Sequence, residues 1–178
     1  NRENALAATA AATELGIPFS VIRDALTAFR GIGRRMETVG RMQGATVALD
    51  YAHHPTEIAA ALSAAAERAA AGGGRVLCLF QPHTYTRTAA LWEDFAAALG
   101  LADKTLLLDI YAAREEPLPG ITSAALAAAC GADYAPDFGA AVEWAGTHAR
   151  QDDLLLLMGA GDIDRLVRYL PLDPVAGE

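Results

Sequence analysis

The chain has 178 residues, of which 53% are hydrophobic and 20% are charged, and its formal net charge is −8. This length and composition predict a globular protein with one complete domain and room for part of another. An acidic chain has no general affinity for nucleic acid or anionic membranes, so any anion must bind at a local basic cluster. No apolar stretch reaches the roughly 18–20 residues that span a bilayer, and no signal peptide is visible.

The two cysteines, Cys78 and Cys130, have no CxxC spacing. Cys78 lies within the apolar run RVLCLF, which predicts a buried core thiol. This cysteine content gives no disulfide framework and is consistent with the cytoplasm, where we expect the protein to act. The chain starts without methionine in a strongly helical pattern, so we expect it to be cut from a longer protein.

The N-terminal part predicts two helices followed by a linker. Residues 1–15 form an Ala-rich helical pattern that stops at a glycine, and residues 20–29 repeat apolar side chains at helical spacing. The next segment, RGIGRR, combines two glycines with three arginines and is typical of a linker. We therefore expect one domain to end near residue 33, so that 1–33 and 34–178 are separate units.

Strands and helices alternate over the rest of the chain. Strands such as RVLCLF and DLLLLM contain continuous apolar runs, which indicate burial on both faces, as in a parallel sheet covered by helices. The predicted fold is therefore α/β and doubly wound, with a mostly parallel sheet flanked by helices. Strands are expected near 36–42, 45–50, 75–80, 104–111, 132–135 and 153–158, and helices near 56–71, 88–99, 122–129, 138–149 and from after Gly161 to Leu170.

Polar residues follow several of these strands. In such sheets ligands bind beyond the carboxyl ends of the strands, so these segments are the candidates for function. The segments are DYAHHP after strand 45–50, QPHTYTRT after 75–80, IYAAREEP after 104–109 and GAGD after 153–158. Three of the four are rich in groups capable of chemistry, and we expect the functional site at this edge.

One interpretation of this edge is a metal site. Aspartate and histidine at short spacing are typical of metal ligands, and a metal-dependent phosphoesterase would use them. The chain has no HxH or HExxH pattern, however, and few acidic residues follow its strands, so we expect no metal ligands here. The residues in question are Asp50, Tyr51, His53, His54 and His83.

The other interpretation is a site for an anionic substrate and a nucleotide. Arg87, near a helix start, can bind a carboxylate in bidentate fashion, and Asp50 can accept hydrogen bonds from ribose. For several of these residues a purely structural role is the alternative interpretation. Asp50 can be a turn aspartate, Tyr51 a packing aromatic, and His54 the turn into a helix that starts with Pro55.

Three further motifs have two interpretations each. Arg34 and Arg35 are either solvated linker charges or phosphate ligands that act when two domains close. The GAGD loop (159–162) is either a phosphate loop or a tight turn into the last helix. Glu115 and Glu116 are either catalytic or part of an exposed acidic loop. No Walker-type GxxxxGK[ST] motif occurs, so any triphosphate loop lies outside this chain.

Taken together, these motifs resemble the Mur ligase family. The matching stretches occur in the family's order and span nearly the whole chain: NRENALAA, GIGRRME, DYAHHPTEI, FQPHTYTRT, DIYAAREEPLPG and MGAGDI. The pairing of DYAHHPTEI with FQPHTYTRT is the most specific, and it is similar to the form that adds L-alanine to UDP-N-acetylmuramate in peptidoglycan synthesis. The recycling ligase that adds a tripeptide to the same sugar shares AHHPT and stays an alternative, as does a non-catalytic nucleotide-binding module.

The resemblance implies a three-domain, ATP-dependent ligase with a Rossmann-like C-terminal domain. Residues 1–33 would be the last helices of the central ATP-binding domain, and residues 34–178 the C-terminal ligase domain. ATP and Mg2+ would be held mostly by the central domain, and the partners would be UDP-N-acetylmuramate, L-alanine and the two domains absent from this chain. The 178 residues alone would then be inactive.

The resemblance also assigns roles to individual residues. Asn4 matches an asparagine that contacts adenine, Arg35 an arginine that contacts phosphate, and Asp50 the acid that binds ribose. The residues that match the surroundings of alanine and the muramoyl carboxyl are Tyr51, His53, His83 and Arg87; His53 and His83 are also the catalytic candidates, since one of them would take the amine proton or orient the nucleophile. Thr84 departs from the family, where arginine is frequent, so anion binding would depend more on Arg87.

Overall fold

The computed structural model describes residues 2–29 and 31–173, which divide into two compact units, Asn1–Ile32 and Gly33–Glu178. The first unit contains α1 (Arg2–Glu14) and α2 (Phe19–Ala28). Among its described residues only Ile22 is buried. Its large exposed apolar side chains are Leu6, Leu15, Ile17, Phe19, Val21, Leu26, Phe29 and Ile32. The first unit therefore has almost no core of its own.

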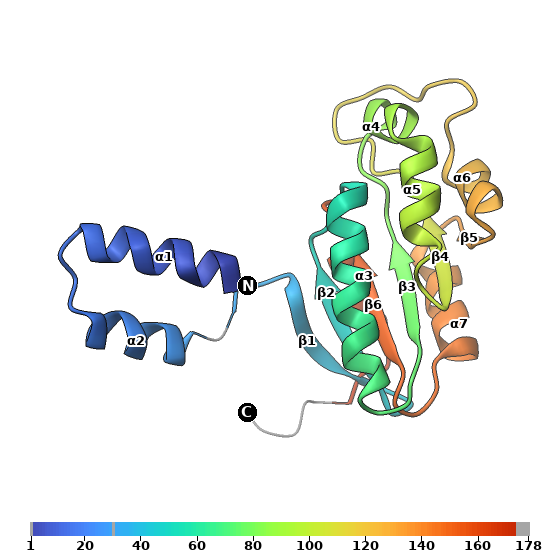
Figure 1. The fold of residues 1–178 in the computed structure, drawn as a ribbon. Coiled ribbons are helices and arrows are strands. Elements are labelled where there is room, and N and C mark those ends of the chain that lie inside the picture. Colours follow the sequence, from blue (N-terminus) through green and yellow to red (C-terminus); the bar gives the residue numbers. More distant parts are fainter. Residues whose placement is uncertain (1, 30, 174–178) are drawn as a thin grey trace. The chain divides into compact units, whose positions relative to one another are not determined.

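The second unit contains a six-stranded sheet with the strand order β1-β2-β6-β3-β4-β5 (Figure 1). β1 pairs antiparallel with β2, and every other pair is parallel. The strands are β1 (Arg35–Met42), β2 (Ala45–Asp50), β3 (Val76–Phe80), β4 (Lys104–Leu108), β5 (Asp133–Ala135) and β6 (Leu154–Met158). This arrangement confirms the predicted α/β fold with a mostly parallel sheet.

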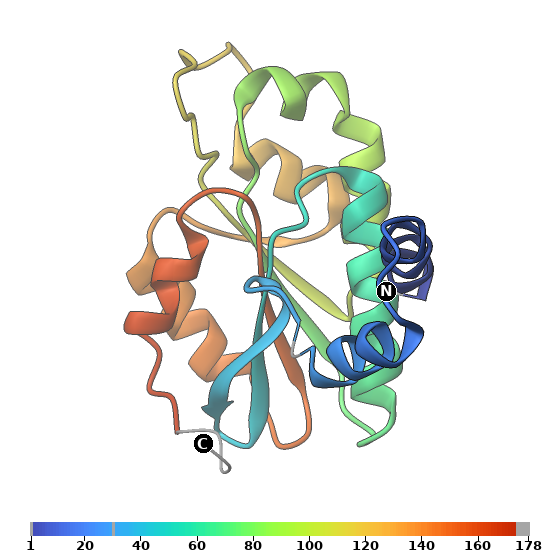
Figure 2. The ribbon, with the colours of Figure 1, turned by 90° about the vertical axis from the view of Figure 1, so that its left-hand side faces the viewer.

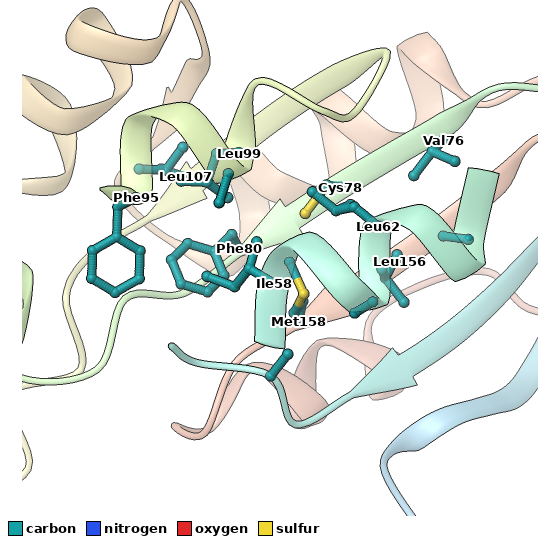
Figure 3. Packing of buried hydrophobic residues seen from close by; sticks show 14 of the residues in the cluster. Ile58, Leu62, Val76, Cys78, Phe80, Phe95, Leu99, Leu107, Leu156 and Met158 are labelled. Atoms are coloured by element: carbon teal, nitrogen blue, oxygen red, sulfur yellow. The ribbon is translucent and has the colours of Figure 1, made fainter. Parts of the chain in front are cut away.

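Helices cover both faces of the sheet (Figure 2). One layer holds α3 (Pro55–Ala70), α5 (Trp92–Leu99) and α6 (Ser123–Cys130), and the other holds α7 (Phe138–His148) and the short 3₁₀ helix η1 (Ile163–Arg168). Side chains alternate between the layers along each strand, as the strand period of two requires. In β3, Cys78 and Phe80 pack under α3 and α5 (Figure 3), whereas Leu77 and Leu79 face α7. Burial on both faces explains why these strands are apolar throughout.

Three predicted elements differ in the structure. The expected helix 88–99 is wrong, because the chain forms α4 (Tyr85–Ala90) and α5 with a break at Leu91, whose backbone leaves the helical region at φ −119°. The expected strand 104–111 ends at Leu108, and Tyr111 pairs instead with His83 in an isolated bridge. The last helix is a six-residue 3₁₀ turn, not an α-helix.

The buried thiol predicted for Cys78 is confirmed, and its burial strongly raises its pKa. Cys130 is only partly buried, and both thiols are free. None of the helices in residues 2–29 and 31–173 is long and apolar enough to cross a membrane.

Asp153 fixes the amino-terminal edge of the sheet, opposite the candidate site. Its buried carboxylate accepts hydrogen bonds from Arg75 N at 2.9 Å, Arg75 Nη2 at 2.6 Å and Arg150 N at 3.1 Å. Burial alone would raise the pKa of this carboxyl, but the bonds from Arg75 and Arg150 outweigh it and hold the pKa below its ordinary value of 3.8. The starts of β3 and β6 are thereby tied together.

We expect Asp153→Asn to destabilise the 178-residue chain by about 2 kcal/mol, because an amide replaces a carboxylate that faces Arg75. Since the pKa is lowered in the folded state, this contribution is complete above the ordinary value and is lost as pH falls through the folded value. Urea unfolding at neutral and acidic pH measures it. The exposed neighbour Asp152→Asn is the control, expected to change stability by less than about 0.5 kcal/mol. Equal losses for both variants would contradict this account.

Candidate functional site

The carboxyl ends of β2, β6 and β3 lie side by side. β6 pairs with β2 on one side and with β3 on the other. The backbone bonds continue beyond the strands, from Gly159 N to Asp50 O at 3.1 Å and from Gln81 N to Met158 O at 3.0 Å. The three segments that follow these strands therefore meet at one edge, as the sequence predicts.

Asp50 is buried at this edge, and its carboxylate bonds to the backbone on both sides. Oδ1 accepts a hydrogen bond from Ala52 N at 2.8 Å, and Oδ2 accepts one from Met36 N at 3.0 Å. Asp50 thus has the turn role that the sequence left open. Each carboxylate oxygen keeps a second lone pair, so it retains the capacity to accept a further hydrogen bond.

The adjacent histidines have different surroundings. His54 is the exposed N-cap residue of α3, directly before Pro55, so it forms the predicted turn. Glu57 Oε2 accepts bonds from the backbone N of His53 at 3.1 Å and of His54 at 3.3 Å. The His53 ring is oriented by Tyr51, because its Nδ1 lies 3.0 Å from Tyr51 O. His53 is therefore held in place by its own loop.

His53 and His83 come together although they follow different strands. Their ring centroids are 6.2 Å apart, and the His53 ring also contacts the edge of Tyr51 at 5.5 Å. The His83 ring stacks on Tyr111 at 5.5 Å. The structure thus places Tyr51, His53, His83 and Tyr111 in one row, and Tyr111 is a member that the sequence analysis missed.

His83 and Arg87 each have a buried nitrogen without a partner among the described residues, His83 Nδ1 and Arg87 Nη1. Burial lowers the pKa of His83, and the charge of Arg87 lowers it further, so the imidazole is mostly neutral near pH 7. A buried donor without a partner is costly. An anion at Arg87 would remove that cost, and a neutral imidazole beside it can accept a proton.

Arg34 is anchored on the loop after β6, a contact that local sequence patterns do not reveal. Arg34 Nη2 donates to Gly159 O at 2.6 Å and to Gly161 O at 3.3 Å, and its guanidinium lies over the Tyr51 ring at 4.8 Å. The solvated role left open for Arg34 is therefore wrong. Arg35, the predicted phosphate ligand, stays exposed, with its guanidinium carbon 6.0 Å from the Tyr51 ring.

The GAGD loop is a tightly packed turn. A β-carbon on Gly161 would lie 2.3 Å from Gln81 Oε1, so no larger residue fits there without a shift. Gln81 is buried and holds the loop, because its side chain donates to Asp162 Oδ1 at 3.0 Å and accepts from Ile163 N at 3.1 Å. The loop directs two carbonyl oxygens to Arg34, whereas a phosphate site requires N–H donors. These contacts favour the predicted turn.

The remaining candidates do not join this row. Asn4 lies exposed on α1, which belongs to the first unit, whereas the row of residues lies on the second unit. In the part of the chain that the structure describes, no three His, Cys, Asp or Glu side chains form a group able to hold a metal ion. Asp50 bonds to the backbone and His54 Nδ1 lies 3.0 Å from Thr56 Oγ1, so the geometry gives a metal-dependent phosphoesterase no support.

Comparisons with known proteins agree with this fold. Residues 34–161 match the family described as Mur ligase, glutamate ligase domain. A UDP-N-acetylmuramate–L-alanine ligase of Mycolicibacterium smegmatis is 47% identical over 165 residues, which cover 92% of this chain and 34% of that protein. The chain thus spans about a third of the length of the curated relatives it matches.

Two solved structures are similar over most of the chain. The UDP-N-acetylmuramate-alanine ligase of Thermotoga maritima has a TM-score of 0.73 and 26% identity, covering 93% of this chain and 35% of that one. A murein peptide ligase of Psychrobacter arcticus has a TM-score of 0.67 and 29% identity, covering 94% and 35%. With its family match, its sheet order and the residues at its carboxyl edge, the chain belongs to the Mur ligase family.

Proposed function

We propose that this chain is part of an ATP-dependent ligase that forms an amide between the carboxyl of UDP-N-acetylmuramate and L-alanine during peptidoglycan synthesis. The curated relatives carry the name of this reaction. The structural observation that supports it most is the unpartnered Arg87 nitrogen beside a mostly neutral His83. An amino-acid acceptor requires that pair, an anion site for its carboxylate and a base for its amine.

The acceptor would bind with its carboxylate on Arg87, so that its amine points at the activated muramic carbon. ATP with Mg2+ supplies the phosphoryl group that makes this carboxyl reactive, as an acyl phosphate. Positioning of the amine is then the main contribution of this domain. Both histidines are candidate proton acceptors: the contact of His53 Nδ1 with Tyr51 O at 3.0 Å places the proton on Nδ1 and leaves Nε2 free to accept, and the lowered pKa of His83 keeps its imidazole mostly neutral. Tyr51 and His53 would line the acceptor pocket.

Three residues of this chain are proposed to contact the nucleotide. Asp50 would accept from the ribose hydroxyls, and its two backbone bonds hold the carboxylate in a fixed orientation for this. Arg35 would contact phosphate, for which its exposed position is suitable. Asn4 would contact adenine. Mg2+ would be held mostly by residues outside this chain.

We assign residues 1–33 to the end of the central ATP-binding domain and 34–178 to the C-terminal ligase domain. The exposed apolar side chains of α1 and α2 support this, since helices of this kind are stabilised by packing against another surface. The 178 residues alone would be inactive, and the whole enzyme would act in the cytoplasm.

The acceptor preference tests the proposed function. We expect the full-length parent protein to release phosphate from ATP when UDP-N-acetylmuramate and L-alanine are both present. The tripeptide substrate of murein recycling is the second acceptor to test, since a murein peptide ligase has a similar fold. Phosphate release with the tripeptide but not with L-alanine would assign the protein to murein recycling. Release with neither acceptor would contradict the ligase assignment.

Arg87→Ala and His53→Ala test the acceptor site in the same protein. We expect each to raise the KM for alanine about tenfold or more, because a charge-assisted hydrogen bond or an oriented pocket wall is lost. The KM for ATP should change less than about twofold, as expected for an interaction confined to the acceptor. Arg41→Ala, an exposed arginine near the opposite end of the sheet, is the control. Equal rises of both KM values would count against the assignment.

A further inference from the structure

We propose that Glu115 is a positioning residue that fixes the short helix α4 and thereby aims Arg87 at the acceptor carboxylate. This inference rests on the proposed function and adds a residue to it. Glu115 lies in the long segment between β4 and α6. The sequence allows two interpretations of this residue: it is either catalytic or part of an exposed acidic loop.

Helix α4 needs support from outside itself. It has only six residues, Tyr85–Ala90, and a helix of this length has little stability alone. Its N-cap residue Thr84 makes no side-chain cap bond and has a left-handed backbone at φ +69°. The helix also ends at Ala90, directly before the break at Leu91. Arg87 is in its first turn, so any motion of α4 moves the Arg87 guanidinium.

Glu115 supplies the missing cap. Its Oε2 accepts a hydrogen bond from Thr86 N at 2.9 Å, and its Oε1 accepts one from Thr86 Oγ1 at 2.5 Å. A carboxylate at the first turn of a helix is also favoured by the helix dipole. These bonds lower the pKa of Glu115, so the carboxylate is charged at neutral pH. Both of its oxygens hold Thr86, the residue directly before Arg87.

The loop is shaped to bring Glu115 to this place. A turn closes from Glu115 N to Ala112 O at 2.9 Å, with Ala113 at φ +55°. Earlier in the loop, Tyr111 N donates to Pro82 O at 2.8 Å, and Tyr111 O accepts from Thr84 N at 2.9 Å. The loop therefore holds the segment with His83 and Arg87 at two separate points.

A direct role for Glu115 in binding the acceptor carboxylate conflicts with its charge. A carboxylate repels the carboxylate of an amino acid, and both oxygens already have donors within the protein. The neighbouring Glu116 is exposed and has no hydrogen bond within the described residues. Glu116 is a carboxylate in the same loop without the contact to α4, and it therefore serves as the control.

The test uses the full-length protein and phosphate release with UDP-N-acetylmuramate, ATP and L-alanine. We expect Glu115→Ala to raise the KM for alanine roughly five- to tenfold, with the KM for ATP changed less than about twofold. Glu115→Gln should recover part of this loss, since its amide oxygen can still accept from Thr86 N. Glu116→Ala should behave as wild type.

Thr86→Val separates positioning from direct contact and replaces Glu115→Ala if that variant does not fold. It removes the hydroxyl donor alone, so we expect a smaller rise in the KM for alanine and no further rise when it is combined with Glu115→Ala. The inference is overturned if Glu115→Ala matches Glu116→Ala, if Thr86→Val has no effect, or if the KM values of all substrates rise together. Absence of alanine-dependent phosphate release in the wild type would instead overturn the proposed function.

Discussion

The insertion of β6 between β2 and β3 is the constraint on which the rest of the structure depends. This strand is the last one in residues 31–173, yet its five apolar residues are buried and pair with both neighbours. Its carboxyl end therefore meets Asp50 on one side and Gln81 on the other. Because Asp153 fixes the opposite end of the same strand, the register at the site is set from both ends.

A common arrangement follows at that edge, where one residue of an adjacent pair is anchored and the other is left available. Arg34 is tied to Gly159 and Gly161, which leaves Arg35 exposed. The histidine pair differs in another way, since His54 is the exposed N-cap residue of α3 while the His53 ring is held in the aromatic row with His83. Thr86 is held by Glu115, and the next residue, Arg87, keeps a nitrogen without a partner. The hydrogen bonds of Arg34 and Thr86 thus fix the backbone directly beside Arg35 and Arg87.

Much of this could be predicted from the sequence, because burial leaves a direct pattern. The wholly apolar runs of β3 and β6 predict a covered parallel sheet. The rule that ligands bind beyond strand ends places Asp50, His53 and His83 at one edge. The contact of Arg34 with Gly159 joins residues 125 positions apart, and no local pattern specifies such a pair. The break at Leu91 also has no signal in the sequence, since neither glycine nor proline marks it.

The most direct measurement is a crystal structure of the full-length protein with UDP-N-acetylmuramate, a non-hydrolysable ATP analogue and L-alanine. The quantity of interest is the distance between Arg87 Nη1 and the alanine carboxylate. We expect a hydrogen bond of about 2.7–3.0 Å, with the amine on the side of His83. An alanine carboxylate bound by other residues, with Arg87 still without a partner, would contradict the central claim that this edge of the sheet is the acceptor site.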